Sequence, residues 1–197
     1  MTKLSRKDLY SLEEYSEIRD DFRARVMEHK KNRRLELGEH LVLFFEDRLV
    51  MHYQVQEMLK AEKIFDADGI QEELDAYNPL IPDGTNWKAT MMIQYADITE
   101  RQKMLARLVG IEHKIWLRVG DHDKIYPIAD EDLERATEDK TSAVHFLRFE
   151  LTPSMIADVH KGAVLSAGVE HEHYSVTVDS VPQNVAESLA TDLQSIQ

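Results

Sequence analysis

Residues 54–84 read QVQEMLKAEKIFDADGIQEELDAYNPLIPDG, and this stretch predicts two short helices that run into a stiff turn. In the first helix, Val55, Met58 and Leu59 fall on one face, and in the second Ile70 and Leu74 do the same. Acidic residues occupy many of the remaining positions. This pattern is typical of amphipathic helices that pack on one side and face water on the other.

Two carboxylates border these apolar stripes. Glu62 takes the next position on the first stripe, Glu73 borders the second, and the short loop at 65–68 would bring them together. Because an isolated buried carboxylate is costly, it must be paired, neutralised or bound to a metal. We therefore expect a divalent-metal or small-ligand site at Glu62 and Glu73, with acid–base catalysis as a further alternative. The structural alternatives are ion pairs with an arginine such as Arg107 or Arg148, or side chains that reach solvent.

The segment after the two helices is rich in turn-forming residues. Its two prolines fix two φ angles, and its Asp-Gly pair at 83–84 is common in turns. One interpretation is a recognition loop for a partner protein, with four candidate contact residues: Tyr77, Asn78, Pro79 and Pro82. The alternative is a rigid connector whose Leu80 and Ile81 fill the edge of the core.

Helices and strands are interspersed on either side of this stretch. Periodicity and capping residues predict further helices over residues 12–31, from Thr99 to before Gly110, and over 153–161 and 182–193. Apolar runs predict strands over residues 40–45, 87–95, 114–119, 124–129, 142–151 and 164–178. Short connections such as 120–123 favour antiparallel neighbours. We predict an α+β fold: an antiparallel or mixed sheet with helices packed mainly on one face. It forms a single domain over 1–197, with 1–37 as a helical segment packed on it.

Three histidines on predicted strands are further candidate metal ligands. His171 and His173, two positions apart on a strand, point the same way and can ligate one ion, while His145 lies on a separate strand. The alternatives are a hydrogen-bonded His145 at the core edge, and a polar strand end with a bulge or turn near 170–174. The predicted helices contain no Glu-x-x-His motif, which argues against a helical di-iron site.

Composition excludes several functions. A formal net charge of −13 argues against nucleic-acid binding, which requires a basic face. The sequence has no run of about 18 apolar residues, as a membrane span requires, and its first residues lack the apolar core of a signal peptide. With no cysteine, the chain cannot hold a thiolate-ligated iron–sulfur cluster. We expect a cytoplasmic protein that binds neither membrane nor nucleic acid.

Five phrases of the sequence carry a family resemblance: QVQEMLKAEKI (54–64), EELDAYNPLIPDG (72–84), KATMMIQY (88–95), RLVGIE (107–112) and AVHFLRFELTP (143–153). They resemble an uncharacterised bacterial family, domain of unknown function 3501, and the similarity runs from about Leu9 to the C-terminal helix. The resemblance assigns no catalytic residues. Members of the family are often encoded near rubrerythrin-like and iron–sulfur oxidoreductase proteins. The resemblance therefore implies a link to redox or oxidative-stress metabolism, with partners of those two kinds.

Two functional hypotheses follow. The first is a non-enzymatic accessory protein that binds a partner through the surface near the helix pair and residues 78–84. The second is a metal-dependent enzyme or metal-binding protein that uses Glu62, Glu73 and a sheet histidine.

Overall fold

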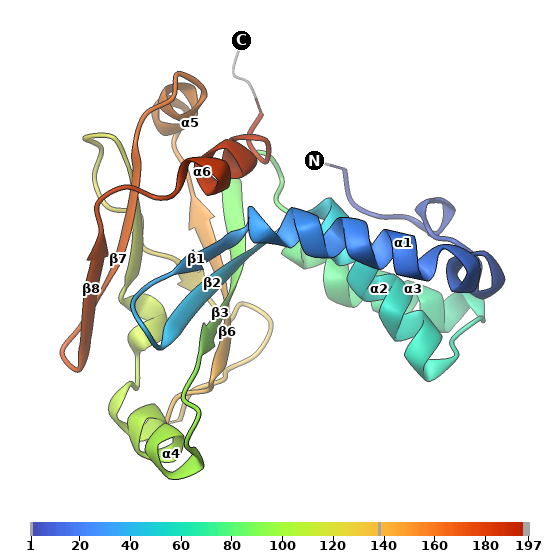
Figure 1. The fold of residues 1–197 in the computed structure, drawn as a ribbon, viewed down its shortest axis with the longest axis horizontal. Helices are drawn as coiled ribbons and strands as arrows, with labels where there is room; N and C mark the ends of the chain where they lie inside the picture. Colours follow the sequence, from blue (N-terminus) through green and yellow to red (C-terminus); the bar gives the residue numbers. More distant parts are fainter. Residues whose placement is uncertain (1, 138, 195–197) are drawn as a thin grey trace.

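The computed structural model describes residues 2–137 and 139–194. In this part of the chain, six α-helices and two antiparallel sheets form the predicted α+β fold (Figure 1). The helices are α1 (Leu12–Lys31), α2 (Arg48–Glu62), α3 (Ala67–Tyr77), α4 (Ile98–Arg107), α5 (Pro153–His160) and α6 (Gln183–Ala190). The strands are β1 (Arg34–Glu36), β2 (Leu41–Glu46), β3 (Asn86–Ile93), β4 (Ile115–Val119), β5 (Ile128–Ala129), β6 (Val144–Glu150), β7 (Leu165–His171) and β8 (Tyr174–Val178). Short 3-10 turns are η1 (Arg6–Asp8), η2 (Asn78–Leu80) and η3 (Ile111–His113).

The two sheets enclose the main hydrophobic core, and we call this part of the molecule the sheet body. Sheet A has the strand order β1-β2-β3-β6-β5, and sheet B has the order β4-β7-β8. The segment at 125–129 joins them, because Ile125 forms a bridge to Leu117 of sheet B before β5 pairs with β6. On the opposite side, the Tyr174 hydroxyl donates a hydrogen bond of 2.6 Å to the Leu37 carbonyl. The two sheets are therefore tied at both margins.

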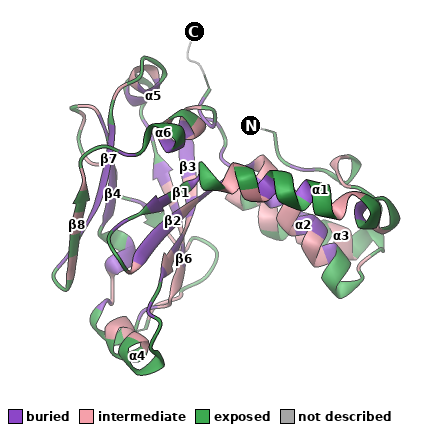
Figure 2. Ribbon diagram, in the orientation of Figure 1, coloured by how far each residue is buried: buried purple, intermediate pink, exposed green. Residues whose placement is uncertain are grey.

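Strand β3 shows why sheet A forms. Trp87, Ala89 and Met91 alternate into the core, as the period of two in a strand requires. Lys88 and Thr90 point to the opposite side, which we call the outer face of sheet A. Figure 2 shows buried residues concentrated in the strands, whereas exposed residues line the outward faces of the helices.

Helices α1, α2 and α3 form a separate group to one side of sheet A, which we call the helical lobe (Figure 1). Local sequence sets its helix ends: Ser11, Asp47 and Asp66 each accept a hydrogen bond from a backbone amide in the first turn of α1, α2 and α3. The lobe has two small apolar clusters of its own, one around Val55 and Leu74 and one around Phe22. It therefore packs largely on itself.

A buried ion network joins the lobe to the sheet body. Arg33, only 1% exposed, follows α1 and donates to the carbonyls of Phe45 (2.9 Å) and Glu46 (3.0 Å). It also forms a two-point pair with Asp192, at 3.2 and 2.5 Å. Asp47, which caps α2, lies 3.5 Å from the same guanidinium. Arg33 thus connects the strands of sheet A with the chain after α6 and with the start of α2.

Three local predictions differ from the structure. Helix α4 begins at Ile98 with Asp97 as its cap, since the Asp97 carboxylate, and not Thr99, accepts from the Glu100 amide at 2.7 Å. Residues 34–36, predicted to belong to the helical segment, alternate in burial and form β1. The extended segment at 164–178 is a hairpin and no single strand, because β7 and β8 pair at His171 and Tyr174 across a two-residue turn, which confirms the alternative of a turn near 170–174. This turn explains the change in burial parity near residue 171.

Candidate functional site

A groove of about 620 Å³ lies where the end of α3 and η2 meet the outer face of sheet A. We call it the lobe groove. Its apolar lining comes from Tyr77, Pro79 and Leu80 on the lobe side and from Phe146 on β6. Its polar lining is Asp75, Lys88, Glu131, Asp132 and Arg148. Ligand sites commonly occupy such junctions between two packed units.

Sheet register positions the charged groups of the groove. Lys88 pairs with Arg148 of β6 on one side and with Glu46 of β2 on the other, so the three side chains form one row across the outer face. The Lys88 ammonium donates a hydrogen bond to the Pro79 carbonyl. Burial lowers the pKa of Lys88, Arg148 lowers it further, and Asp83 opposes the shift.

Three of the other four charges at the groove, those of Arg148, Glu131 and Asp132, are matched locally. Arg148 donates to both carboxylate oxygens of Glu131, at 2.7 and 2.6 Å, and also pairs with Glu150. These hydrogen bonds raise the pKa of Arg148 and lower the pKa of Glu131. Arg135 pairs with Asp132 and lies over the Phe146 ring, 4.6 Å from its centroid. The groove therefore offers an apolar surface framed by salt bridges that are already complete.

The four residues predicted to contact a partner divide into two pairs. Tyr77 and Pro79 line the lobe groove. Asn78 instead ties down the N-terminal segment, because its side chain accepts from the Leu4 amide (2.7 Å) and donates to the Leu4 carbonyl (2.9 Å). Pro82 is buried in the connector to β3.

Glu73 is half-buried on α3, and the charge of Glu62 at the end of α2 acts on it. Partial burial raises the pKa of Glu73, and the negative charge of Glu62 raises it further. Glu62 itself is exposed at the end of α2. The arginines considered as partners are engaged elsewhere: Arg148 pairs with Glu131, and Arg107 lies 3.4 Å from His173.

His145 lies in a buried polar chain inside the sheet body. Its Nδ1 is 2.5 Å from Asp130, and its Nε2 is 2.8 Å from the Thr141 hydroxyl. Thr141 also lies 3.4 Å from the buried carboxylate of Glu112. Asp130 adopts a left-handed conformation, with φ of 51°, which lets its carboxylate also accept from the Phe146 amide at 2.9 Å. Both nitrogens of His145 are thus engaged by protein groups.

His171 and His173 lie at the β7–β8 turn, with ring centroids 5.8 Å apart. The Nε2 of His171 is 3.1 Å from the Val109 carbonyl, and its Nδ1 accepts from the His173 amide at 3.2 Å. The five predicted metal ligands therefore lie in three places: Glu62 and Glu73 in the lobe, His145 in sheet A, and the histidine pair in sheet B. Within residues 2–137 and 139–194, no group of three or more acidic or histidine side chains could hold a metal ion.

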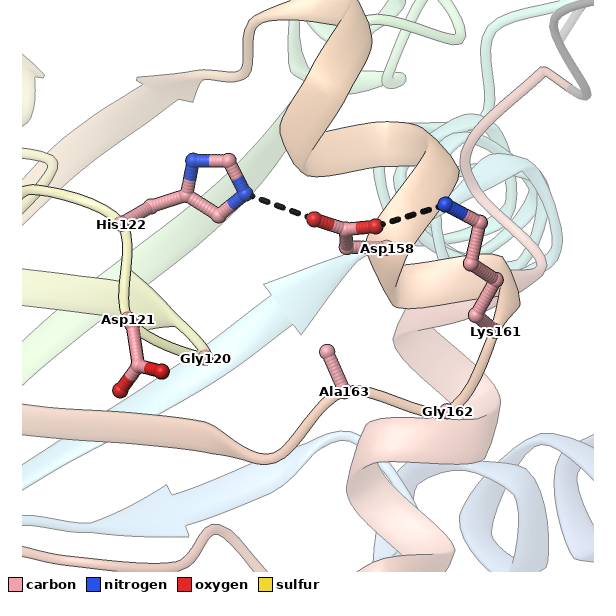
Figure 3. Close-up of a pocket in the computed structure, with 7 residues that line it drawn as sticks. All are labelled: Gly120, Asp121, His122, Asp158, Lys161, Gly162 and Ala163. Carbon is pink, nitrogen blue, oxygen red and sulfur yellow. Dashed lines mark hydrogen bonds and ion pairs between the residues drawn. The ribbon is translucent and has the colours of Figure 1, made fainter.

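Sequence reasoning missed two features of the surface. Lys88 and Phe146 meet in the lobe groove through strand pairing, which no local motif signals. A second cavity, of about 510 Å³, lies between the turn after β4 and the end of α5 (Figure 3). There Asp158 lies 2.9 Å from His122 and accepts from Lys161 at 2.9 Å. The hairpin at 120–123 was predicted, but its contact with α5 was not.

Comparison with protein families gives one match over nearly the whole chain. The model of a family described as a protein of unknown function (DUF3501) matches residues 3–193. The chain belongs to this family. Membership confirms the resemblance stated from the sequence phrases, and it carries no activity with it.

A solved structure has the same fold. The crystal structure of a protein of unknown function from Burkholderia pseudomallei K96243 is 54% identical in sequence and superposes with a TM-score of 0.93. The match covers 98% of this chain and 100% of that one. A search of curated proteins finds no match. Among the described residues, no helix combines the length and apolar character needed to cross a membrane.

Proposed function

We propose that this protein is a cytoplasmic accessory protein of redox or oxidative-stress metabolism, and that it holds a partner protein at the lobe groove. The observation that carries the proposal is the groove itself, where Tyr77, Leu80 and Phe146 offer apolar surface at a junction of two packed units. Aromatic residues are enriched where protein interfaces bury their centres. Because most charges at the groove are already paired, an apolar segment can dock there without leaving them unpaired.

The choice of partner follows from the family resemblance alone. Rubrerythrin-like proteins and iron–sulfur oxidoreductases are therefore the first partners to test. The groove alone is smaller than a standard interface, which buries roughly 800 Å² per partner. Surfaces beside it on α3 and β6 would have to take part.

The test measures binding of the full chain to each purified partner by isothermal titration calorimetry. We expect Phe146→Ala to weaken binding at least about tenfold, since a central aromatic anchor carries much of an interface's energy. The matched control is Ile98→Ala, which removes an exposed apolar side chain, 62% accessible, on α4. Equal affinity of both variants and the wild type would refute docking at this groove. Thermal unfolding of each variant separates lost binding from lost folding.

A divalent-cation site at Glu62 and Glu73 is the second candidate, and one observation favours it. The charge of Glu62 contributes to the raised pKa of Glu73, so a cation between them would relieve that repulsion. We expect tag-free protein to carry stoichiometric iron, manganese or zinc that Glu62→Gln loses, as measured by elemental analysis. Metal retained equally by wild type and variant would exclude this site.

A further inference from the structure

We propose that Lys88 is a nucleophilic amine, and that the lobe groove captures small apolar aldehydes or ketones on it as reversible imines. This inference goes beyond the docking of a partner and does not depend on it. It rests on the position of one side chain in the sheet and on the cavity that it faces.

Two charged residues flank Lys88 in sheet A. Its cross-strand neighbour on β6 is the cation Arg148, and paired side chains of this kind lie about 5 Å apart at Cβ. Its neighbour on β2 is Glu46, a buried carboxyl that accepts from the Thr90 hydroxyl at 2.6 Å and whose other oxygen has no partner. Burial raises the pKa of Glu46, which disfavours its negative form.

Other charged groups also act on Lys88, and the opposing charge of Asp83 has the largest effect among them. Asp83 and Glu131 oppose the effect of Arg148, and Lys3 adds to it. Among the described residues, no carboxylate lies within 4.0 Å of the Lys88 nitrogen. Desolvation beside a second cation is a recognised way to activate a lysine, because it increases the fraction present as neutral amine. The lowered pKa of Lys88 agrees with this arrangement.

The shape and chemistry of the cavity suit a small apolar compound. Its volume of about 620 Å³ is ample for a benzene ring or a short alkyl chain. The walls beside Lys88 are Tyr77, Leu80 and Phe146, which suit an apolar body. Arg148 already pairs with Glu131 and Glu150, so the groove presents no free guanidinium for a carboxylate or phosphate. An uncharged carbonyl compound fits these features better than an anionic one.

The chemistry balances without any further reagent. The neutral Lys88 nitrogen attacks the carbonyl carbon and forms a C–N bond, while the C=O π electrons move to oxygen, which takes up a proton. The nitrogen gives up one proton to complete the neutral carbinolamine. The carbinolamine then loses its hydroxyl with a second proton as water, and the nitrogen loses its remaining proton as the C=N bond forms. In each capture event, one amine and one carbonyl compound give one imine and one water, and hydrolysis of the imine reverses the reaction. The hydrogen bond to the Pro79 carbonyl holds the nitrogen at the lip of the groove until the attack.

The experiment uses benzaldehyde as the probe on the full chain alone, with cyanoborohydride to reduce any imine, and peptide mass mapping to find the labelled lysines. Lys161 is the internal reference, because its side chain is 74% exposed and it pairs only with Asp158. We expect Lys88 to be labelled several-fold faster than Lys161 at pH 7. Labelling of Lys88 at the rate of Lys161 or below would overturn the proposal.

Two variants sharpen the result. Arg148→Gln removes the neighbouring cation and should slow labelling of Lys88 while leaving Lys161 unchanged. Phe146→Ala removes an apolar wall and should reduce the preference of Lys88 for benzaldehyde over formaldehyde. The circular dichroism spectrum reports whether each variant is folded. Since no partner is present, failure here leaves the docking proposal standing, and failure of docking leaves this one.

Discussion

The helical lobe and the sheet body of this protein are stabilised in different ways. The sheet body has one continuous apolar core that draws on both sheets and on helices α5 and α6. The lobe has two small clusters, and their fully buried members are few. Because apolar burial scales with the surface removed from water, the sheet body gains far more from it than the lobe does.

Polar contacts between α1 and α2 compensate in part for the smaller apolar core of the lobe. Glu57 on α2 accepts hydrogen bonds from the Tyr15 hydroxyl (2.7 Å) and from two nitrogens of Arg19 (2.8 and 2.7 Å) on α1. Buried Gln56 accepts from the Tyr10 amide at 2.7 Å. The lobe should therefore open more readily than the sheet body, and its stability should depend more on pH.

The largest expected effect comes from breaking the link between the two regions. Arg33→Ala should lower the free energy of unfolding by about 4 kcal/mol, because it leaves the buried Asp192 without its counter-ion. Urea unfolding followed by circular dichroism measures the loss. Arg34→Ala is the matched control: its guanidinium is half-exposed and pairs with exposed Glu36, so its loss should cost less than about 1 kcal/mol. Similar losses in both variants would show that the buried network does not join the regions.

A pair of core truncations tests whether the regions unfold separately. Leu43→Ala in β2 and Leu74→Ala in α3 each remove a side chain that is at most 1% exposed, and each should cost about 3 kcal/mol. Hydrogen exchange should distinguish them. We expect Leu74→Ala to speed exchange in α1, α2 and α3 alone, and Leu43→Ala to speed it throughout the chain. Uniform acceleration in both variants would mean that the molecule opens as one unit.

The smallest expected effect concerns how the stability of the lobe depends on pH. Hydrogen bonds from Arg19 lower the pKa of Glu57 from 4.5 to about 2. A carboxyl with a depressed pKa stabilises the folded state above its unfolded value, so this contribution is complete above pH 4.5 and is lost as pH falls toward 2. Glu57→Gln should lower the free energy of unfolding by about 1 kcal/mol at neutral pH. The stability of the lobe, measured by hydrogen exchange, should then change little between pH 4.5 and 2. Glu17→Gln, which alters an exposed acid of α1, should leave the acid dependence intact.

The sequence predicted those features that depend on neighbouring residues. Ser11 with Glu14, and Thr152 with Pro153, mark the starts of α1 and α5 because capping is a contact within one turn. The short loop that joins α2 and α3 is likewise a local feature, and the charge of Glu62 acts on Glu73.

The features that could not be predicted from the sequence depend on pairing between distant segments. Lys88 meets Arg148, and Asp130 meets His145, only because β3, β5 and β6 are adjacent in sheet A. Strand β5 has two residues, too few for a periodic pattern. The predicted roles of Glu62, Glu73, His145, His171 and His173 in metal binding remain predictions, as does partner contact at Tyr77 and Pro79.

The path of the chain between the regions bears on biosynthesis. All three lobe helices lie within the first 77 residues, so the lobe can assemble on the ribosome before most of the sheet body has been made. Strand β2 lies between α1 and α2 in the chain, yet its partner β3 begins only at Asn86. Until then the apolar run Leu41–Phe45 can pair only with the three-residue strand β1, and its other edge stays open while more than 40 further residues leave the exit tunnel. Nascent chains stalled in that interval should bind trigger-factor-type chaperones at this run, and longer ones should release them.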